Sequence, residues 1–493
     1  MLLAAILGSS IAFVEGSVVG LALPRIQAWF GVDSMALQWV SNGYLLLLGA
    51  CMLPGGIAGD RFGLRRVFVL GTVLFSVGAI LCALAPSFSI LLAARALQGL
   101  GGALLVPNSL ALISVHYPVD ARAEAIGRWA GAAALTTAAG PVLGGVLVDE
   151  LGWRSVFLVV VPVACAAIAV TLLRVPPARP ASNQTIDWLS AALLVLGLGL
   201  ALLSLTRAAE GAGGSVEVVT AGLGGMLLVA FWRRQRRASA PMLPPALLAN
   251  RAFVGANLVT ALLYAGLGAA LYFLPFQLIQ GLGYSATQAG AALLPFTLII
   301  GFGSGAAGRL MGRLGTRTLL VAGPVLAGVG LGLLAASGAE GGFVWGVLPG
   351  VTALGVGMAL SVAPLTAAVM AAVDDESAGV ASGINNTASR LAGLLAVALA
   401  TVLAVTVFRG SLATQLANLA LPGAVRIDLL GEAGRLADLP VPEALPAALR
   451  VQVAQAVTDA FTAAFRWIMA LCAVAAGCAA VVSALTLREG SPT

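Results

Sequence analysis

The sequence is poor in charge. Only 9% of its residues are charged and 60% are hydrophobic, whereas soluble proteins carry about 25% charged residues. A soluble chain of this composition would have almost no polar surface to present to water. The scarcity of charge excludes a soluble globular protein and indicates a polytopic membrane protein.

Residues that serve metal, redox and nucleotide sites are also scarce. The chain has no lysine and one histidine, His116, which has no clustered partner. Its five cysteines lie in apolar runs without a C-x-x-C pair, as small buried hydrophobic residues do. No G-x-x-x-x-G-K-[ST] loop occurs, which argues against direct use of ATP. We therefore expect no metal site and no cofactor.

Long apolar stretches recur along the whole chain, each sufficient to cross a hydrocarbon core of ~30 Å. They are continuous and do not alternate as the strands of a membrane barrel do, so only α-helices satisfy their backbone. We predict fourteen membrane-spanning helices, at residues 2–23, 39–58, 67–85, 89–114, 129–148, 155–173, 188–206, 216–232, 252–274, 287–308, 318–336, 343–371, 380–407 and 458–487.

The distribution of arginine predicts the orientation. With the N-terminus inside, the predicted inner loops hold sixteen arginines and the outer loops seven. Positive residues accumulate on the cytoplasmic side, so both termini are predicted to be cytoplasmic. This topology explains the net charge of +6 without a nucleic-acid partner. Three arginines remain inside predicted helices: Arg95, Arg390 and Arg466.

An internal repeat divides the chain. A shift of 252 residues superposes a G-x-x-x-x-R-x-G-x-R pattern, so that Gly56, Arg61, Gly63 and Arg65 fall on Gly308, Arg313, Gly315 and Arg317. We infer an N-terminal six-helix half at 1–178, an insertion of two helices and linkers at 179–250, and a C-terminal six-helix half at 251–493. Parallel repeats are typical of transporters that bind substrate between the halves. For the long predicted outer loop, 408–457, a plain connector is favoured over a functional lid, and its tail is expected to form a short interfacial helix.

The loop GIAGDRFGLRR at residues 56–66 contains a candidate conformational latch. Its glycines allow a tight turn between two helices, and an aspartate can face the positive end of a neighbouring helix. A basic loop that only sets topology would need neither this aspartate nor the glycine spacing. The latch residues are Gly56, Asp60, Arg61, Gly63 and Arg65.

Two charged residues lie at similar depth inside helices. Glu15 is eight residues, or ~12 Å, from the predicted outer end of its helix, and Arg95 is six residues, or ~9 Å, from the outer end of its own. Charges inside a membrane usually pair or line a cavity. Burial favours the neutral form of Glu15 and Arg95 favours its charged form, so the two are proton-coupling candidates. A purely structural ion pair is the alternative.

Helix 129–148 carries Gly140, Pro141, Gly144 and Gly145. Proline removes one backbone hydrogen bond and glycine removes a side chain, so the helix can bend here or let another helix approach closely. We expect a hinge at these residues. Ordinary glycine packing between membrane helices is the alternative.

Together these motifs resemble the fourteen-helix drug:proton antiporter branch of the major facilitator superfamily. Residues 56–66 resemble the family's motif between helices 2 and 3. Arg95, Gln98 and Gly99 match its R-x-x-Q-G motif, and residues 127–145 match its antiporter motif. The resemblance covers nearly the whole chain and implies the all-helical major facilitator fold, with two six-helix halves and two inserted helices.

The chain departs from that branch at four positions. Glu15, Ser17 and Gly20 stand where the branch has aspartate, threonine and asparagine, and Thr136 stands where a glycine is usual. In the family such carboxylates take part in proton coupling or substrate binding. The change from aspartate to glutamate affects substrate preference more than coupling.

The function implied by the resemblance is multidrug efflux with antibiotic resistance. We expect a proton-coupled antiporter, not an enzyme, that exports hydrophobic, cationic drugs from a bacterial-type cell through the inner membrane by alternating access. Its partners would be the substrate, protons and membrane lipids, and it would act as a monomer. Substrate-binding candidates are Trp39, Asn42, Tyr44, Gln98, Asn108, Tyr272, Phe276, Gln277, Asn385 and Asn386.

Three alternatives stay open. The same fold can export a lipid or a specific metabolite, and Arg95 and Arg390 would suit an anionic headgroup. A sensor would bind a ligand without moving it. A membrane-embedded enzyme is disfavoured because the predicted helices contain no H-E-x-x-H motif and no cluster of histidine and acidic residues.

Overall fold

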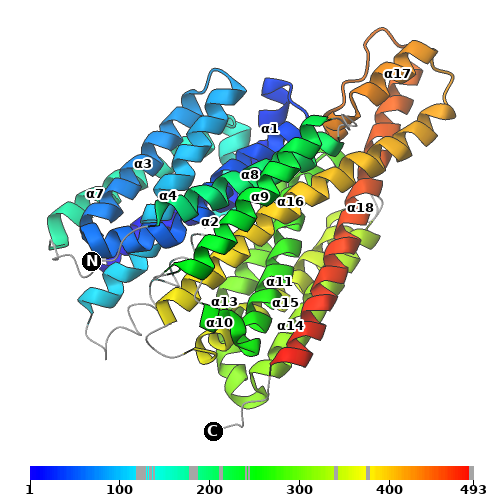
Figure 1. The fold of residues 1–493 in the computed structure, drawn as a ribbon. Coiled ribbons are helices and arrows are strands. Elements are labelled where there is room, and N and C mark those ends of the chain that lie inside the picture. The colour runs from blue at the N-terminus through cyan, green and yellow to red at the C-terminus, as the bar shows by residue number, and fades with distance from the viewer. Residues whose placement is uncertain are drawn as a thin grey trace.

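The computed structural model describes residues 1–117, 129, 132, 136, 139–176, 187–209, 215–238, 241, 245–337, 342–373 and 378–487. Throughout these residues the elements are helices, and no strand occurs among them (Figure 1). Twelve helices in the described part are long and apolar enough to span a membrane, and a bent pair within residues 2–30 makes a thirteenth. The predicted all-helical membrane fold is confirmed. Predicted helix 129–148 lies only partly within the described residues.

The helices follow the order expected from the sequence. The first half contains α1 (Leu2–Phe30), α2 (Ser34–Phe62), α3 (Leu64–Leu84), α4 (Phe88–His116), a helix over residues 139–151, α6 (Ser155–Leu158) and α7 (Val160–Arg174). Then come α8 (Trp188–Ala209), α9 (Ser215–Arg237) and α10 (Pro245–Ala249). The second half contains α11 (Arg251–Phe276), η1 (Gln277–Gly281), α12 (Ala286–Ala292), α13 (Leu294–Leu314), α14 (Thr316–Ala336), η3 (Gly342–Val347), α15 (Leu348–Ala371), α16 (Ala378–Ala417), α17 (Gly423–Gly431), η5 (Ala433–Asp438) and α18 (Ala447–Thr486).

The repeat seen in the sequence has a glycine with a positive φ angle at the same place in both halves. Gly63 and Gly315 have φ angles of 97° and 79°, a region that glycine enters without strain. Nearby, an arginine of each half donates a hydrogen bond of 2.8 Å to a carbonyl of α7 or α18: Arg65 to Leu172 and Arg317 to Ala484. The repeated G-x-R sequence therefore joins the second and third helices of each repeat to the helix that ends it.

The inserted pair packs on the outside of the seam between the halves. Side chains of α8 contact both α2 and α16 in one apolar cluster that includes Leu46, Leu202 and Leu394. At one end of the pair, Arg234 of α9 lies 2.9 Å from Asp187, just before α8. Partial burial raises the pKa of the Asp187 carboxyl, but hydrogen bonds from Arg234 and Ser190 outweigh burial and hold that pKa below its usual value.

Two helices are longer than the sequence suggested. α16 and α18 each contain 40 residues, or ~60 Å, about twice a hydrocarbon core. The predicted interfacial helix in loop 408–457 is therefore wrong, because from Ala447 onward the chain is one helix with α18. Both extensions continue because their apolar faces are buried, as at Leu412, Leu416 and Val453.

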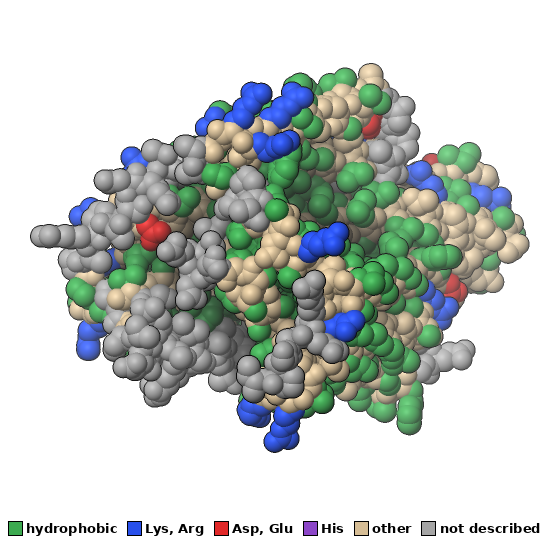
Figure 2. All heavy atoms as spheres, turned by 60° about the horizontal axis from the view of Figure 1, so that its bottom comes forward, with side chains coloured by type: hydrophobic (Ala, Val, Ile, Leu, Met, Phe, Trp, Pro, Cys, Tyr) green, Lys and Arg blue, Asp and Glu red, His purple; other side chains and the backbone are tan. Residues whose placement is uncertain are grey.

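The extended helices project from one end of the bundle together with α17 (Figure 1). Following the predicted orientation, we call this the outer end and the opposite one the inner end. At the outer end, Gln27 of α1 donates a hydrogen bond of 3.0 Å to the carbonyl of Arg435 in η5. Figure 2 shows the inner end, where arginine side chains stand around a hollow with hydrophobic walls.

Candidate functional site

Glu15 and Arg95 form an ion pair inside the first half. Arg95 Nη1 lies 2.5 Å from Glu15 Oε1, and both side chains are buried. The similar depth of Glu15 and Arg95 in their helices predicted that the two charges could meet. In the structure α1 packs on α4, and this packing brings the two side chains together. Among the described residues, Glu15 Oε2 has no hydrogen-bond partner. This oxygen can take up a proton without displacing any donor.

The guanidinium of Arg95 is held by other groups as well. Its Nε donates to the carbonyl of Val40 at 2.7 Å, and its Nη1 donates to Gln98 Oε1 at 2.8 Å. It also lies 4.5 Å from the centre of the Tyr44 ring, a favourable cation–π position. Arg95 would therefore remain fixed when the charge on Glu15 changes.

A cavity of about 370 Å³ lies between the two halves. Helix α1 and residue 141 line it from the first half, and α11, α13 and α16 line it from the second. The lining residues are Ala12, Phe13, Gly16, Gly20, Leu21, Pro141, Tyr264, Leu271, Pro275, Leu293, Phe296, Thr297 and Arg390. Of the predicted site residues only Pro141 is among them, and Glu15 faces the interior of the first half instead.

The substrate-binding candidates of the first half lie mostly inside that half. Tyr44 and Gln98 contact Arg95. Asn42 Nδ2 donates to Gln38 Oε1 at 3.5 Å. Asn108 donates to the carbonyl of Gly55 at 2.9 Å and so joins α4 to α2.

The remaining candidates, which except for Trp39 belong to the second half, do not line the cavity either. Tyr272 and Phe276 pack ring to ring at 5.7 Å. Gln277 donates to Thr462 Oγ1 at 3.3 Å, and Asn385 Oδ1 accepts from Thr260 at 2.6 Å. Asn386 is exposed. Trp39 lies in the apolar cluster of α2, α8 and α16. The cavity walls therefore come from neighbouring positions that the sequence did not single out, such as Phe13, Tyr264 and Phe296.

The glycines of residues 139–151 allow close contact on two sides. A Cβ atom on Gly144 would lie 2.8 Å from Val18 Cγ1 of α1. A Cβ atom on Gly145 would lie 2.5 Å from the carbonyl oxygen of Ala286 and 2.6 Å from Thr287 Cα, both in α12. Distances under 3 Å leave no room for a side chain. Gly140 is buried beside them, whereas Gly127 of the same motif lies outside the described residues.

Asp149 adds a polar contact between the halves that the sequence analysis missed. Its Oδ2 accepts hydrogen bonds from Thr287 N at 2.7 Å and Thr287 Oγ1 at 2.6 Å, and its Oδ1 accepts from Ala286 N at 3.2 Å. The carboxylate thus caps the first turn of α12 across the seam. The S-x-x-Q capping box at Ser285 marks that turn in the sequence, but nothing in the sequence connects it to Asp149.

Asp149→Asn should loosen this outer contact. Hydrogen bonds to a charged group are worth about 1.5–3 kcal/mol, so we expect the closed arrangement to lose about tenfold or more in population. Hydrogen–deuterium exchange at residues 286–292 should rise. Glu150→Gln is the matched control, because Glu150 is exposed on the same helix. Equal hydrogen–deuterium exchange in the two variants would show that Asp149 does not stabilise the contact with α12.

In the loop of the candidate latch, Gly59 is tightly packed, whereas Gly56 and the aspartate have free space around them. A Cβ atom on Gly59 would collide with the amide of Asn108, whereas one on Gly56 would come no nearer than 3.8 Å to Pro107. Arg61 lies over the ring of Phe62, 5.5 Å from its centre. Asp60 is exposed, and among the described residues it has no hydrogen bond and no ion pair.

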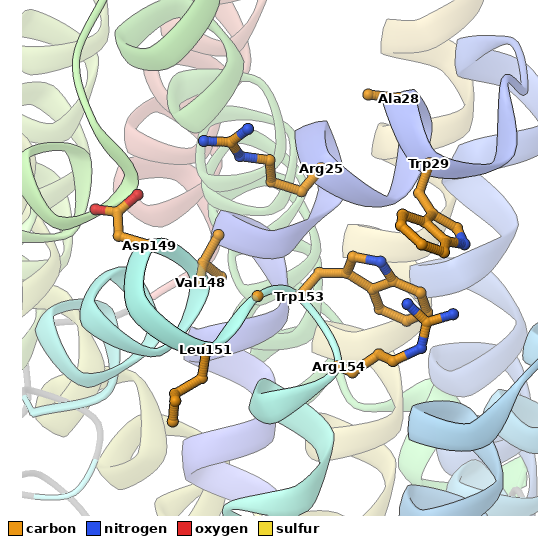
Figure 3. A pocket seen from close by; sticks show the side chains of 9 residues that line it. Arg25, Ala28, Trp29, Val148, Asp149, Leu151, Trp153 and Arg154 are labelled. Atoms are coloured by element: carbon orange, nitrogen blue, oxygen red, sulfur yellow. The ribbon is translucent and has the colours of Figure 1, made fainter.

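A second cavity, of about 510 Å³, lies at the outer end (Figure 3). Arg154 lies between two indoles, 4.5 Å from the ring centre of Trp29 and 4.3 Å from that of Trp153. Asp149 lies on the opposite side of this cavity (Figure 3). The G-W-R sequence at 152–154 therefore packs an arginine against two indoles at the outer end of the first half, near the Asp149 contact.

Comparisons with known proteins agree with this geometry. A family model of the Major Facilitator Superfamily matches residues 5–397. Multidrug resistance protein Stp of Mycobacterium tuberculosis (strain ATCC 25618 / H37Rv) is 32% identical over 388 residues, which are 78% of this chain and 71% of Stp. Drug efflux pump JefA of the same strain is 32% identical over 391 residues, 79% of this chain and 77% of JefA.

Two further comparisons extend the set. The "Probable actinorhodin transporter" of Streptomyces coelicolor (strain ATCC BAA-471 / A3(2) / M145) is 31% identical over 401 residues, 79% of this chain and 69% of its own. The crystal structure of a bacterial homolog to the human lysosomal transporter Spinster, in its inward-facing and unoccupied conformation, has a TM-score of 0.66 at 18% identity. That comparison covers 100% of this chain and 98% of the other, and it shows the fold.

Two repeated helical halves around a cavity, with similar transporters over most of the chain, define a multi-pass membrane transport protein. The chain belongs to the Major Facilitator Superfamily. The family predicted from the motifs is thereby confirmed. The relatives named above are a multidrug resistance protein, a drug efflux pump and a probable actinorhodin transporter.

Proposed function

We propose that the protein is a proton-coupled antiporter that exports hydrophobic small molecules through the inner membrane, with both termini in the cytoplasm. The observation that carries the proposal is the buried Glu15–Arg95 pair, in which one carboxylate oxygen has no partner among the described residues. A charge inside a membrane is costly and usually serves a functional role. The Glu15 carboxylate can gain and lose a proton by itself, without a bound cofactor.

Helix α1 connects the proton site to the cavity. It holds Glu15 on one face, and Phe13 and Gly16 on the face that lines the cavity. It also bends by 42° between Gly16 and Val18. A change in the attraction between Glu15 and Arg95 would alter this bend and with it the wall of the cavity. This coupling is the proposed step that links proton uptake to substrate movement.

Alternating access requires that contacts at the two ends exclude each other. At the outer end, Gly145 and Asp149 pack and bond against α12. At the inner end, Asp60 has no partner among the described residues. We infer that the outer contact opens when the latch residues, with Asp60, close the inner end.

Transport in proteoliposomes tests the proposal. With a pH gradient imposed across the membrane, a neutral hydrophobic dye should move uphill, and a protonophore should stop this movement. Uphill movement that persists in the presence of the protonophore would rule out proton coupling. Binding without any movement would indicate a sensor. Flipping of labelled lipid, in place of dye movement, would favour the alternative of lipid export. Arg390 in the cavity also supports that alternative, because it could bind an anionic headgroup.

Asp60→Asn should slow the cycle without preventing substrate binding. A carboxylate at the end of a helix dipole is worth about 0.3–1 kcal/mol, so turnover should fall about two- to fivefold. The repeat-related position is Gly312, where a Cβ atom would meet nothing within 4 Å. Gly312→Ala should therefore leave turnover unchanged. Equal loss in the two variants, measured as initial rates of dye efflux, would argue against an asymmetric latch.

A further inference from the structure

Arg390 lies deep in the second half. It is twelve residues beyond Ala378, where α16 begins at the inner end, which corresponds to ~18 Å along the helix axis. A hydrocarbon core is ~30 Å thick, and Arg390 lies within the apolar span that begins at Gly383, so its charge lies inside the membrane. Its side chain lines the cavity between the halves. A charge at this depth requires a compensating group.

The other two arginines inside helices have such groups. Arg95 has a carboxylate at 2.5 Å and an amide at 2.8 Å. Arg466 is exposed and lies 3.5 Å from the carbonyl of Ser337, at the outer end of α14. Among the described residues, Arg390 has neither a hydrogen bond nor an ion pair. The structure therefore places one uncompensated positive charge in the cavity.

The rest of the cavity wall is apolar or already bonded. Phe13 and Phe296 contribute aromatic rings, and Tyr264 contributes a ring with a hydroxyl group. The hydroxyl of Thr297 donates to backbone carbonyls of its own helix. No carboxylate is among the lining residues. In a site of low polarity the field of a single guanidinium is strong, and it favours anions over cations.

We propose that this cavity takes amphipathic organic anions, with their acidic group on Arg390 and their apolar part against the aromatic walls. The guanidinium can bind a carboxylate through two parallel hydrogen bonds. The proposal rests on the transport function proposed above and specifies its substrate class. It replaces the cationic class expected from the family resemblance, because Glu15, the acidic residue that would attract a cation, faces Arg95 and not the cavity.

Three probes that share one ring system test the charge preference: naphthoate, naphthamide and naphthylmethylammonium. Binding to the purified full-length protein in nanodiscs is measured by calorimetry. The wild type should bind naphthoate about tenfold or more tightly than the ammonium probe, the factor that a charge-assisted hydrogen bond supplies. Arg390→Gln should lose that factor for naphthoate and keep its affinity for naphthamide, which also verifies that the variant is folded.

Two further variants complete the design. Arg390→Lys retains the charge but not the two-pronged geometry, so naphthoate binding should weaken less than in Arg390→Gln. Arg466→Gln removes another helical arginine, one that lies outside the cavity, and should bind all three probes as the wild type does. Equal binding of the three probes by the wild type, tighter binding of the ammonium probe, or no binding of any probe would overturn the proposal. So would an unchanged preference in Arg390→Gln.

Transport of the same probes separates this proposal from the proposed function. Proton-driven movement of all three probes without a charge preference would retain the antiporter and remove the anion site. A preference for naphthoate in binding, with no proton-driven movement of any probe, would retain the anion site and remove the antiporter.

Discussion

Glu15→Gln is expected to reduce uphill export to background while downhill movement of substrate continues. An amide cannot exchange a proton, so the gradient would no longer drive the cycle. The cavity would persist because Glu15 does not line it. The measurement is dye efflux from proteoliposomes with and without a pH gradient. Undiminished uphill export would reduce Glu15 to a structural partner of Arg95.

Stability must be controlled in this experiment. Removal of one partner of a buried ion pair costs about 3–5 kcal/mol, and Arg95 would keep its carbonyl and amide acceptors but lose its counter-charge. Glu15→Asp is the matched control, since it keeps the carboxylate and lengthens the distance to Arg95. It should retain part of the activity with a shifted pH profile. If both variants express and elute from a sizing column equally well, the loss of uphill export in Glu15→Gln is due to the missing proton exchange and not to unfolding.

Gly145→Leu is expected to abolish export in a protein that still inserts into the membrane. The new side chain would occupy the space of the Ala286 carbonyl and Thr287 Cα of α12, so the outer end could not close. Even Gly145→Ala should lower the rate about tenfold, because overpacking costs about 1–3 kcal/mol. Initial efflux rates and hydrogen–deuterium exchange at residues 286–292 would measure both effects.

A glycine with open space provides the comparison. A Cβ atom on Gly305 in α13 would meet nothing within 4 Å, so Gly305→Leu should transport normally. If Gly145→Leu also transported at the wild-type rate, its contact with α12 would not be part of the cycle. The glycines of residues 139–151 would then reflect ordinary packing of membrane helices.

The motif residues show which features of the structure can be predicted from the sequence. The depth of Glu15 and Arg95 in their helices follows from counting residues, because an α-helix rises by a constant 1.5 Å per residue. The G-x-R turns at Gly63 and Gly315 follow from the repeat, because a left-handed φ favours glycine wherever it occurs. These features depend on local backbone geometry alone.

The cavity wall is a feature that could not be predicted from the sequence. Phe13 and Gly16 face the cavity while Glu15, between them, faces Arg95. Which face of α1 meets which neighbour depends on how helices far apart in the chain cross one another. The same applies to α16 and α18, whose ends were predicted from hydropathy. Their outer extensions are helical because they bury apolar faces against each other.

The amino-acid sequence by itself determined that this chain spans a membrane many times, that it has two repeated halves, and that it belongs to the major facilitator superfamily. Hydropathy, residue spacing and motifs are local properties of the chain, and they carry that information. Only the tertiary structure decided which side chains meet across the seam. The contact of Asp149 with Thr287 spans 138 residues, and the exposure of Arg390 to the cavity arises where elements of both halves converge. Such contacts depend on the packing of whole helices, which no single stretch of sequence encodes.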